Sequence, residues 1–156
     1  MDRLYRFSPI LTKDQLDKAI EYVANKTTEL CKKITGNEYP INGLTIFSHY
    51  QDEFDKLKRI AFGLGTLHEE HNGPYVKLFD PISLPHNQLE LLRIRQPDPY
   101  RSQVGCNDFK VPNYEKFLNQ FLKANPNNLR LIKRPEYDMI EFFDPDYDVL
   151  AYVVSK

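Results

Sequence analysis

Hydrophobic side chains recur with a helical period near the start of the chain. Between residues 12 and 36 they follow one another at alternating steps of four and three positions, which places them on one face of a helix. Thr12 and Gln15 match the capping box that begins many helices, and Gly36 is suited to end one. We therefore predict a long N-terminal helix with one buried stripe, made of Leu16, Ile20, Val23, Thr27, Leu30 and Ile34.

Residues 41–97 show a different pattern and predict a strand, a helix and three further strands. The first segment is rich in β-branched and aromatic residues that alternate between two faces. Ser48 and Gln51 match a capping pair, so we expect Ser48 to cap the following helix. Asn72-Gly73 favours the positive φ angles of a tight hairpin turn. The predicted segments are a strand over 41–49, a helix that ends at Gly63 and Gly65, a hairpin on either side of Asn72-Gly73, and a strand over 87–97.

Residues 105–154 repeat this order of elements. The phrase YVKLFDP at 75–81 returns as MIEFFDP at 139–145, an offset of 64 residues because 139 − 75 = 64. Phe54 and Phe117, in the predicted helices of the two halves, are 63 residues apart because 117 − 54 = 63. A nearly shared offset indicates an internal duplication. We predict an α+β fold of two βαβββ units, 41–97 and 105–154, behind an N-terminal extension over 1–40 that contains the long helix.

The composition is that of a globular protein in a reducing compartment. Hydrophobic residues make up 41% of the 156 residues and charged residues 28%, which suffices for a core and a polar surface. Cys31 and Cys106 are far apart, so no disulfide scaffold or zinc ribbon is expected. No segment approaches the roughly 18 apolar residues of a membrane span. We expect a soluble, cytoplasmic protein with no membrane partner.

The charge balance disfavours nucleic acid as a partner. The formal net charge is −1, from 21 basic and 22 acidic residues, so the molecule as a whole does not attract a phosphate backbone. Basic residues lie beside aromatic residues in two places, a mixture that can bind a single strand, but no nucleic-acid motif accompanies them. The two groups are Arg93, Arg95 and Arg101 near Tyr100, and Arg130, Lys133 and Arg134 near Tyr137.

The tandem βαβββ arrangement resembles the vicinal oxygen chelate superfamily, which includes glyoxalase I, extradiol dioxygenases and bleomycin-resistance proteins. The similarity covers about residues 41–154 and leaves the first helix unexplained. It is carried by the strand NGLTIFSH, the helix entry QDEFDKL, the segments HNGPYVKLFDP and NQLELLRIRQP, and the strand GCNDFKV. The resemblance implies a curved sheet in each half, and a cup between the halves that holds a metal ion and a small substrate.

The residues at the family's metal-ligand positions do not favour metal binding here. The resemblance places these positions at Gly43 (or Leu44), at Arg93 and at Asp108, while the last strand, VLAYVV, offers no carboxylate or imidazole. Glu90 is another carboxylate on the fourth strand, but strand alternation puts it on the face opposite Arg93. We therefore predict that the family metal site is lost and that no cofactor is bound. The side chains of Arg93 and Asp108 then either meet as an ion pair or both point to water.

Three functions remain open, and no catalytic residue is assigned. The favoured one is a glyoxalase-like cup that binds a small anionic molecule without catalysis, because Arg93 and Arg95 share a strand face and can grip a carboxylate or phosphate. A second is a metal-dependent lyase, isomerase or dioxygenase with ligands from Asp108, Glu90, Glu141 and a histidine. A third is an interaction module that docks a partner or a second copy as a homodimer. The candidate cup residues are Arg93, Arg95, Asp108, Thr45 and Glu90.

Two further motifs are interpreted as structural. HEEH at 68–71 adjoins the predicted hairpin turn, so its two imidazoles are expected on opposite faces of a strand rather than on one metal. DPDYD at 144–148 resembles the start of a calcium loop but has Val149 where such a loop needs glycine. We predict a solvated turn at 144–148.

Overall fold

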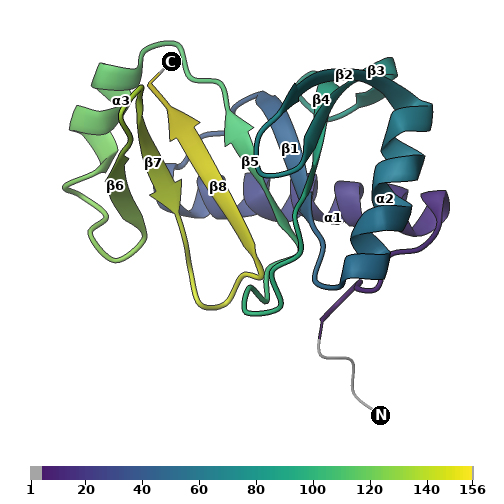
Figure 1. Cartoon of the computed structure of the whole chain (residues 1–156). Helices are drawn as coiled ribbons and strands as arrows, with labels where there is room; N and C mark the ends of the chain where they lie inside the picture. The colour runs from purple at the N-terminus through teal and green to yellow at the C-terminus, as the bar shows by residue number, and fades with distance from the viewer. Residues whose placement is uncertain (1–4, 156) are drawn as a thin grey trace.

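The computed structural model describes residues 5–155, and these form one mixed, curved, open sheet with helices against it (Figure 1). The predicted α+β class is confirmed. The helices are α1 (Lys13–Thr35), α2 (Gln51–Leu64) and α3 (Tyr114–Phe121). The strands are β1 (Ile41–Phe47), β2 (Gly65–Glu70), β3 (Pro74–Ser83), β4 (Gln88–Arg95), β5 (Gly105–Phe109), β6 (Leu129–Lys133), β7 (Asp138–Phe142) and β8 (Val149–Val154).

The predicted N-terminal helix is α1, and its ends are set by local chemistry. The Thr12 hydroxyl accepts a hydrogen bond from the Gln15 backbone N–H at 3.2 Å, and the Gln15 side chain accepts one from the Thr12 N–H at 3.2 Å. Gly36 ends the helix at φ 79°, a left-handed conformation that glycine adopts without steric cost. The apolar stripe faces the sheet, and α1 packs on β1, β5 and β8 behind it (Figure 1).

The sheet has the strand order β2-β3-β4-β1-β5-β8-β7-β6. β1 pairs in parallel with β4, and β5 pairs in parallel with β8. β1 and β5 pair antiparallel at the centre, so residues 41–95 form one side of the sheet and residues 105–154 the other. We call the β1–β5 junction the seam.

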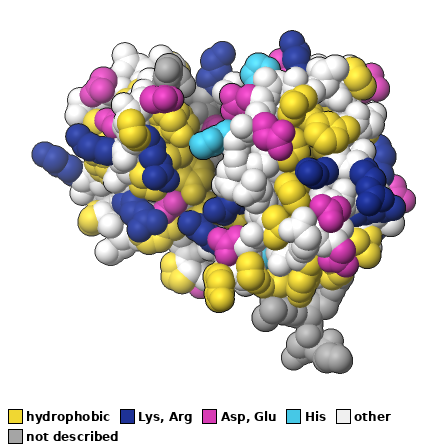
Figure 2. Space-filling model, viewed as in Figure 1, with side chains coloured by type: hydrophobic (Ala, Val, Ile, Leu, Met, Phe, Trp, Pro, Cys, Tyr) yellow, Lys and Arg dark blue, Asp and Glu magenta, His cyan; other side chains and the backbone are white. Residues whose placement is uncertain are grey.

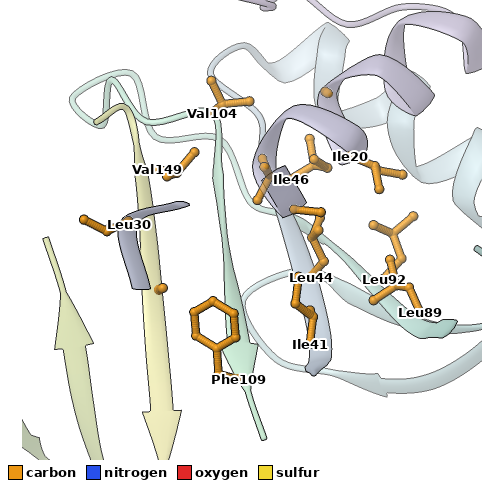
Figure 3. Close-up of a cluster of buried hydrophobic side chains, with 14 of the residues drawn as sticks. Ile20, Leu30, Ile41, Leu44, Ile46, Leu89, Leu92, Val104, Phe109 and Val149 are labelled. Carbon is orange, nitrogen blue, oxygen red and sulfur yellow. The ribbon is translucent and has the colours of Figure 1, made fainter. Parts of the chain in front are cut away.

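The central part of the core lies between the seam and α1, and side chains of α2 and α3 extend it. Ile20 and Leu30 of α1 lie among Leu44, Ile46 and Val149 of the strands (Figure 3), and each is at most 1% exposed. Burial of side chains of this size stabilises a fold by roughly 1.5–3 kcal/mol each. Because successive side chains of a strand point to opposite faces, this core occupies one face of β1 and β4 and leaves their other face free.

Two predictions made from short sequence motifs had different outcomes. The hairpin at Asn72-Gly73 is confirmed, with φ 58° and 107°. The predicted cap by Ser48 is wrong: Tyr50 is the N-cap of α2 and makes no side-chain cap bond. The Ser48 hydroxyl instead donates to the Arg95 carbonyl at 2.6 Å, which ties the end of β1 to the end of β4.

The 144–148 segment is a turn, as predicted, with Pro145 and Asp146 exposed, but its two end carboxylates are not solvated. The Lys33 ammonium of α1 donates to the Asp144 carboxylate at 2.8 Å, and the Asp144 side chain is only 7% exposed. Asp148 accepts hydrogen bonds from the Arg6 guanidinium at 2.8 Å and from the Tyr22 hydroxyl at 2.6 Å. Both carboxylates therefore hold the β7–β8 loop against α1 and the segment before it.

Candidate functional site

The sheet face that α1 leaves free carries the predicted cup residues. Thr45 of β1 lies opposite Arg93 of β4 on one side and opposite Cys106 of β5 on the other. Its neighbours in the strand, Leu44 and Ile46, are fully buried on the α1 side. The alternation of β1 therefore points Thr45 and Phe47 to the opposite face, where they line a cavity of about 260 Å³.

Five arginines line this cavity, together with one carboxylate. Arg93 and Arg95 come from β4, Arg101 from the β4–β5 loop, Arg130 from β6, and Arg134 from the residue after β6. The carboxylate is Glu141, so the lining carries a formal charge of 5 − 1 = +4, whereas the whole chain carries −1. Figure 2 shows Lys and Arg side chains gathered over this face. We refer to this cavity as the arginine cup.

Aromatic rings position the two arginines of β4. The Arg93 guanidinium lies 4.3 Å from the centre of the Tyr75 ring, and the Arg95 guanidinium lies 4.7 Å from that of Phe47. Such cation–π contacts contribute roughly 0.5–2 kcal/mol and leave the N–H edges of the guanidinium available. Arg93 also donates from Nη2 to Glu69 at 3.3 Å, while its buried Nε has no hydrogen-bond partner.

The arginines of the other half are held differently. Arg130 pairs through Nη2 with Glu141 at 2.6 Å, and Glu141 also accepts the Tyr152 hydroxyl proton at 2.8 Å. Glu141 is 4% exposed, so its two oxygens are compensated inside the protein. Arg101 lies 4.0 Å from Asp98. Within residues 5–155, the guanidinium of Arg134 makes no ion pair within 4.0 Å.

Tyr75 crosses β4 and reaches the backbone of β1. Its hydroxyl lies against Gly43, where an added methyl group would overlap the phenol oxygen. Burial is the largest cause that raises the pKa of Tyr75, and the nearby Asp108 raises it further. The phenol is therefore neutral at physiological pH and fills the space beside Gly43.

Of the two alternatives left open for Arg93 and Asp108, the ion pair is not present, because their side chains do not approach within 4.0 Å, and neither side chain simply points to water. Arg93 lies opposite Thr45 and Asp108 lies opposite Gly43, so the two are separated by two strand spacings, each about 4.8 Å. Arg93 pairs instead with Glu69. Burial raises the pKa of Asp108 to about 6, an effect that the charge of Arg93 partly offsets.

The structure brings together only some of the predicted cup residues. Thr45, Arg93 and Arg95 line the arginine cup. Asp108 lines a different cavity of about 410 Å³, and Glu90 is exposed and lies outside the cup. The sequence had indicated the other lining arginines as basic residues but not as parts of the cup: Arg101, Arg130 and Arg134.

Asn72, Cys106, Glu141 and Tyr152 add to the polar lining; of these, the sequence had indicated only Glu141, as a ligand in the metal-dependent alternative. Burial raises the pKa of the Cys106 thiol to about 12, so Cys106 is a neutral thiol. Within residues 5–155, no three His, Cys, Asp or Glu side chains lie in a group that could hold a metal ion. No helix in this part of the chain is long and apolar enough to cross a membrane.

Comparison with known proteins yields a likeness of fold alone. No protein-family model matches the chain, and no curated protein matches it. A solved structure described as "Structural Genomics, Protein EC4020" is similar, with a TM-score of 0.72 at 11% sequence identity. The similarity covers 100% of this chain and 92% of that one, so it includes α1 as well as the sheet.

Proposed function

We propose that the protein is a glyoxalase-like, metal-free binding protein that takes a small anionic molecule in the arginine cup. The observation that carries this proposal is the gathering of five arginines around one cavity of about 260 Å³ in a chain whose net charge is −1. Guanidinium groups bind carboxylates and phosphates through paired, charge-assisted hydrogen bonds. Like charges held this close repel one another, and a bound anion relieves that repulsion.

The arrangement of the strands supports a duplicated βαβββ unit. The first three strands of the two halves start 64 residues apart, because 105 − 41, 129 − 65 and 138 − 74 all equal 64. The sequence phrases carry the same offset. In each half the first strand lies beside the last in parallel. These features favour units at 41–97 and 105–154 and a relationship to the vicinal oxygen chelate superfamily.

The occupants of the family's metal-ligand positions support binding without a metal. Gly43 supplies no donor, and the space next to it is filled by the phenol of Tyr75. Arg93 places a positive charge where a ligand would stand, stacked on the Tyr75 ring. A fixed guanidinium repels a divalent cation and attracts an anion.

The proposal is tested by thermal unfolding in the presence of different anions at constant ionic strength. Phosphate, sulfate and small carboxylates should raise the Tm above its value in chloride, because a ligand that binds only the folded state stabilises it by about 2.7 kcal/mol at 100 times its Kd. Arg95→Gln should weaken the effect. Arg59→Gln, an exposed arginine of α2 outside the cup, serves as the matched control. Equal Tm values in all anions would refute the proposal.

A further inference from the structure

The arginines of the cup stand on two separate walls. Arg93 and Arg95 belong to β4, while Arg134 follows β6. In the sheet these strands are separated by β1, β5, β8 and β7, which together form the floor between the walls. Five strand spacings of about 4.8 Å place β4 and β6 about 24 Å apart along the sheet. Because the sheet is curved, residues from both walls line one cavity.

Each wall carries an arginine whose charge no carboxylate of the described chain balances. Arg130 is compensated by Glu141, Arg93 pairs with Glu69, and Arg101 lies near Asp98. Arg95 on the first wall and Arg134 on the second have no carboxylate within 4.0 Å among residues 5–155.

Between the arginines, the cavity lining also carries uncharged groups. Thr45 and the neutral thiol of Cys106 lie on the floor, and Phe47, Ile132 and Met139 contribute apolar surface. The carboxylate of Glu141 is engaged by Arg130 and Tyr152. A carboxylate accepts hydrogen bonds from nitrogens about 2.7–2.9 Å away, and Arg95 and Arg134 come from different walls, so each of them can bond an anionic group of its own.

We infer that the ligand of the cup is an elongated dianion, with two anionic groups joined by an uncharged spacer. This inference rests on the proposed function and adds the ligand's class and orientation. One anionic group meets Arg95, the spacer lies over Thr45 and Cys106, and the second anionic group meets Arg134.

The test is calorimetric titration of the full chain with α,ω-dicarboxylates of increasing length, from malonate to suberate, at constant ionic strength. Each dicarboxylate is compared with the monocarboxylate of the same length. At one spacer length the dianion should bind at least about tenfold more tightly than its monoanion, because a charge-assisted hydrogen bond is worth about 1.5–3 kcal/mol and 1.4 kcal/mol corresponds to tenfold. Arg95→Gln and Arg134→Gln should each abolish this advantage.

The binding data for these variants are compared with those of control variants. Arg59→Gln should leave the length dependence unchanged, and Arg95→Lys and Arg134→Lys keep the charge if a glutamine variant does not fold. Equal affinities for dianions and monoanions at every length would overturn the inference and leave the proposed function standing. If neither carboxylates nor phosphate bind to the wild-type protein, both fail.

Discussion

Replacing Gly43 with alanine tests whether the Tyr75 phenol fills the floor of the sheet beside the cup. The added methyl group would overlap the Tyr75 oxygen, and the next nearest atom, Cζ of the same ring, would lie 3.0 Å away. Tyr75 is 8% exposed and lies beneath the Arg93 guanidinium, so its ring cannot move aside without loss of contacts. Overpacking of this kind costs roughly 1–3 kcal/mol.

The same substitution should cost far less in a Tyr75→Phe background. Phenylalanine lacks the overlapping oxygen, and only the tight contact at Cζ remains. Replacement of glycine by alanine also reduces the entropy of the unfolded chain, a gain of roughly 0.4–1 kcal/mol. We therefore expect the two substitutions to be coupled by roughly 1–2 kcal/mol in a double-mutant cycle.

The measurement is the free energy of unfolding in urea for the wild type, the two single variants and the double variant. Gly63→Ala in α2 is the control, because a methyl group there would meet no atom within 4 Å. It should stabilise the protein by roughly 0.5–1 kcal/mol. If Gly43→Ala destabilises both backgrounds equally, the phenol oxygen is not what requires glycine at this position.

Two other predictions concern pH. The folded-state pKa of Asp108 is raised from its ordinary 3.8 to about 6, so its contribution to stability is full below pH 3.8 and is lost as pH rises through 6. The free energy of unfolding of Asp108→Asn, measured in urea, should therefore exceed that of the wild type by up to about 3 kcal/mol at pH 7.5 and by little at pH 4. An equal difference at both pH values would contradict this. Burial lowers the pKa of His49, which hydrogen-bonds Ser8 at 2.6 Å and stacks on Tyr5 at 3.9 Å. Its neutral form favours the fold, so the stability difference between wild type and His49→Gln should shrink as pH falls from 7 to 5; a constant difference in unfolding midpoints would count against this.

Features governed by neighbouring residues were predictable from the sequence. Thr12 with Gln15, Gly36 and the Asn72-Gly73 turn each act within a few residues, and each has the expected geometry. Ser48 shows the limit of such signals. Its hydroxyl could serve a local cap, but the parallel pairing of β1 and β4 brings the Arg95 carbonyl within 2.6 Å, and that contact forms instead.

The candidate site was predictable only on its first wall. Thr45, Arg93 and Arg95 follow from strand alternation once the strands are recognised. Arg130 and Arg134 show the same alternation, but their place in the cup depends on strand order and sheet curvature, which are long-range properties. Likewise, Asp144 and Asp148 pair with Lys33 of α1 and with Arg6 before it, each more than 100 positions away in the sequence.

The position of α1 across the seam determines how the molecule can respond to a ligand. The helix packs on β1 from one half of the sheet and on β5 and β8 from the other. A hinge motion between the halves would have to separate these strands from a helix whose side chains Leu16, Ile20, Val23 and Leu30 are at most 1% exposed. The strands between the two walls, β1, β5 and β8, are therefore held in place by α1, and adjustment in the cup is left to the arginine side chains. For the inferred dianion, this rigidity would make spacer length decisive, while the ordering of the arginine side chains would cost conformational entropy on binding.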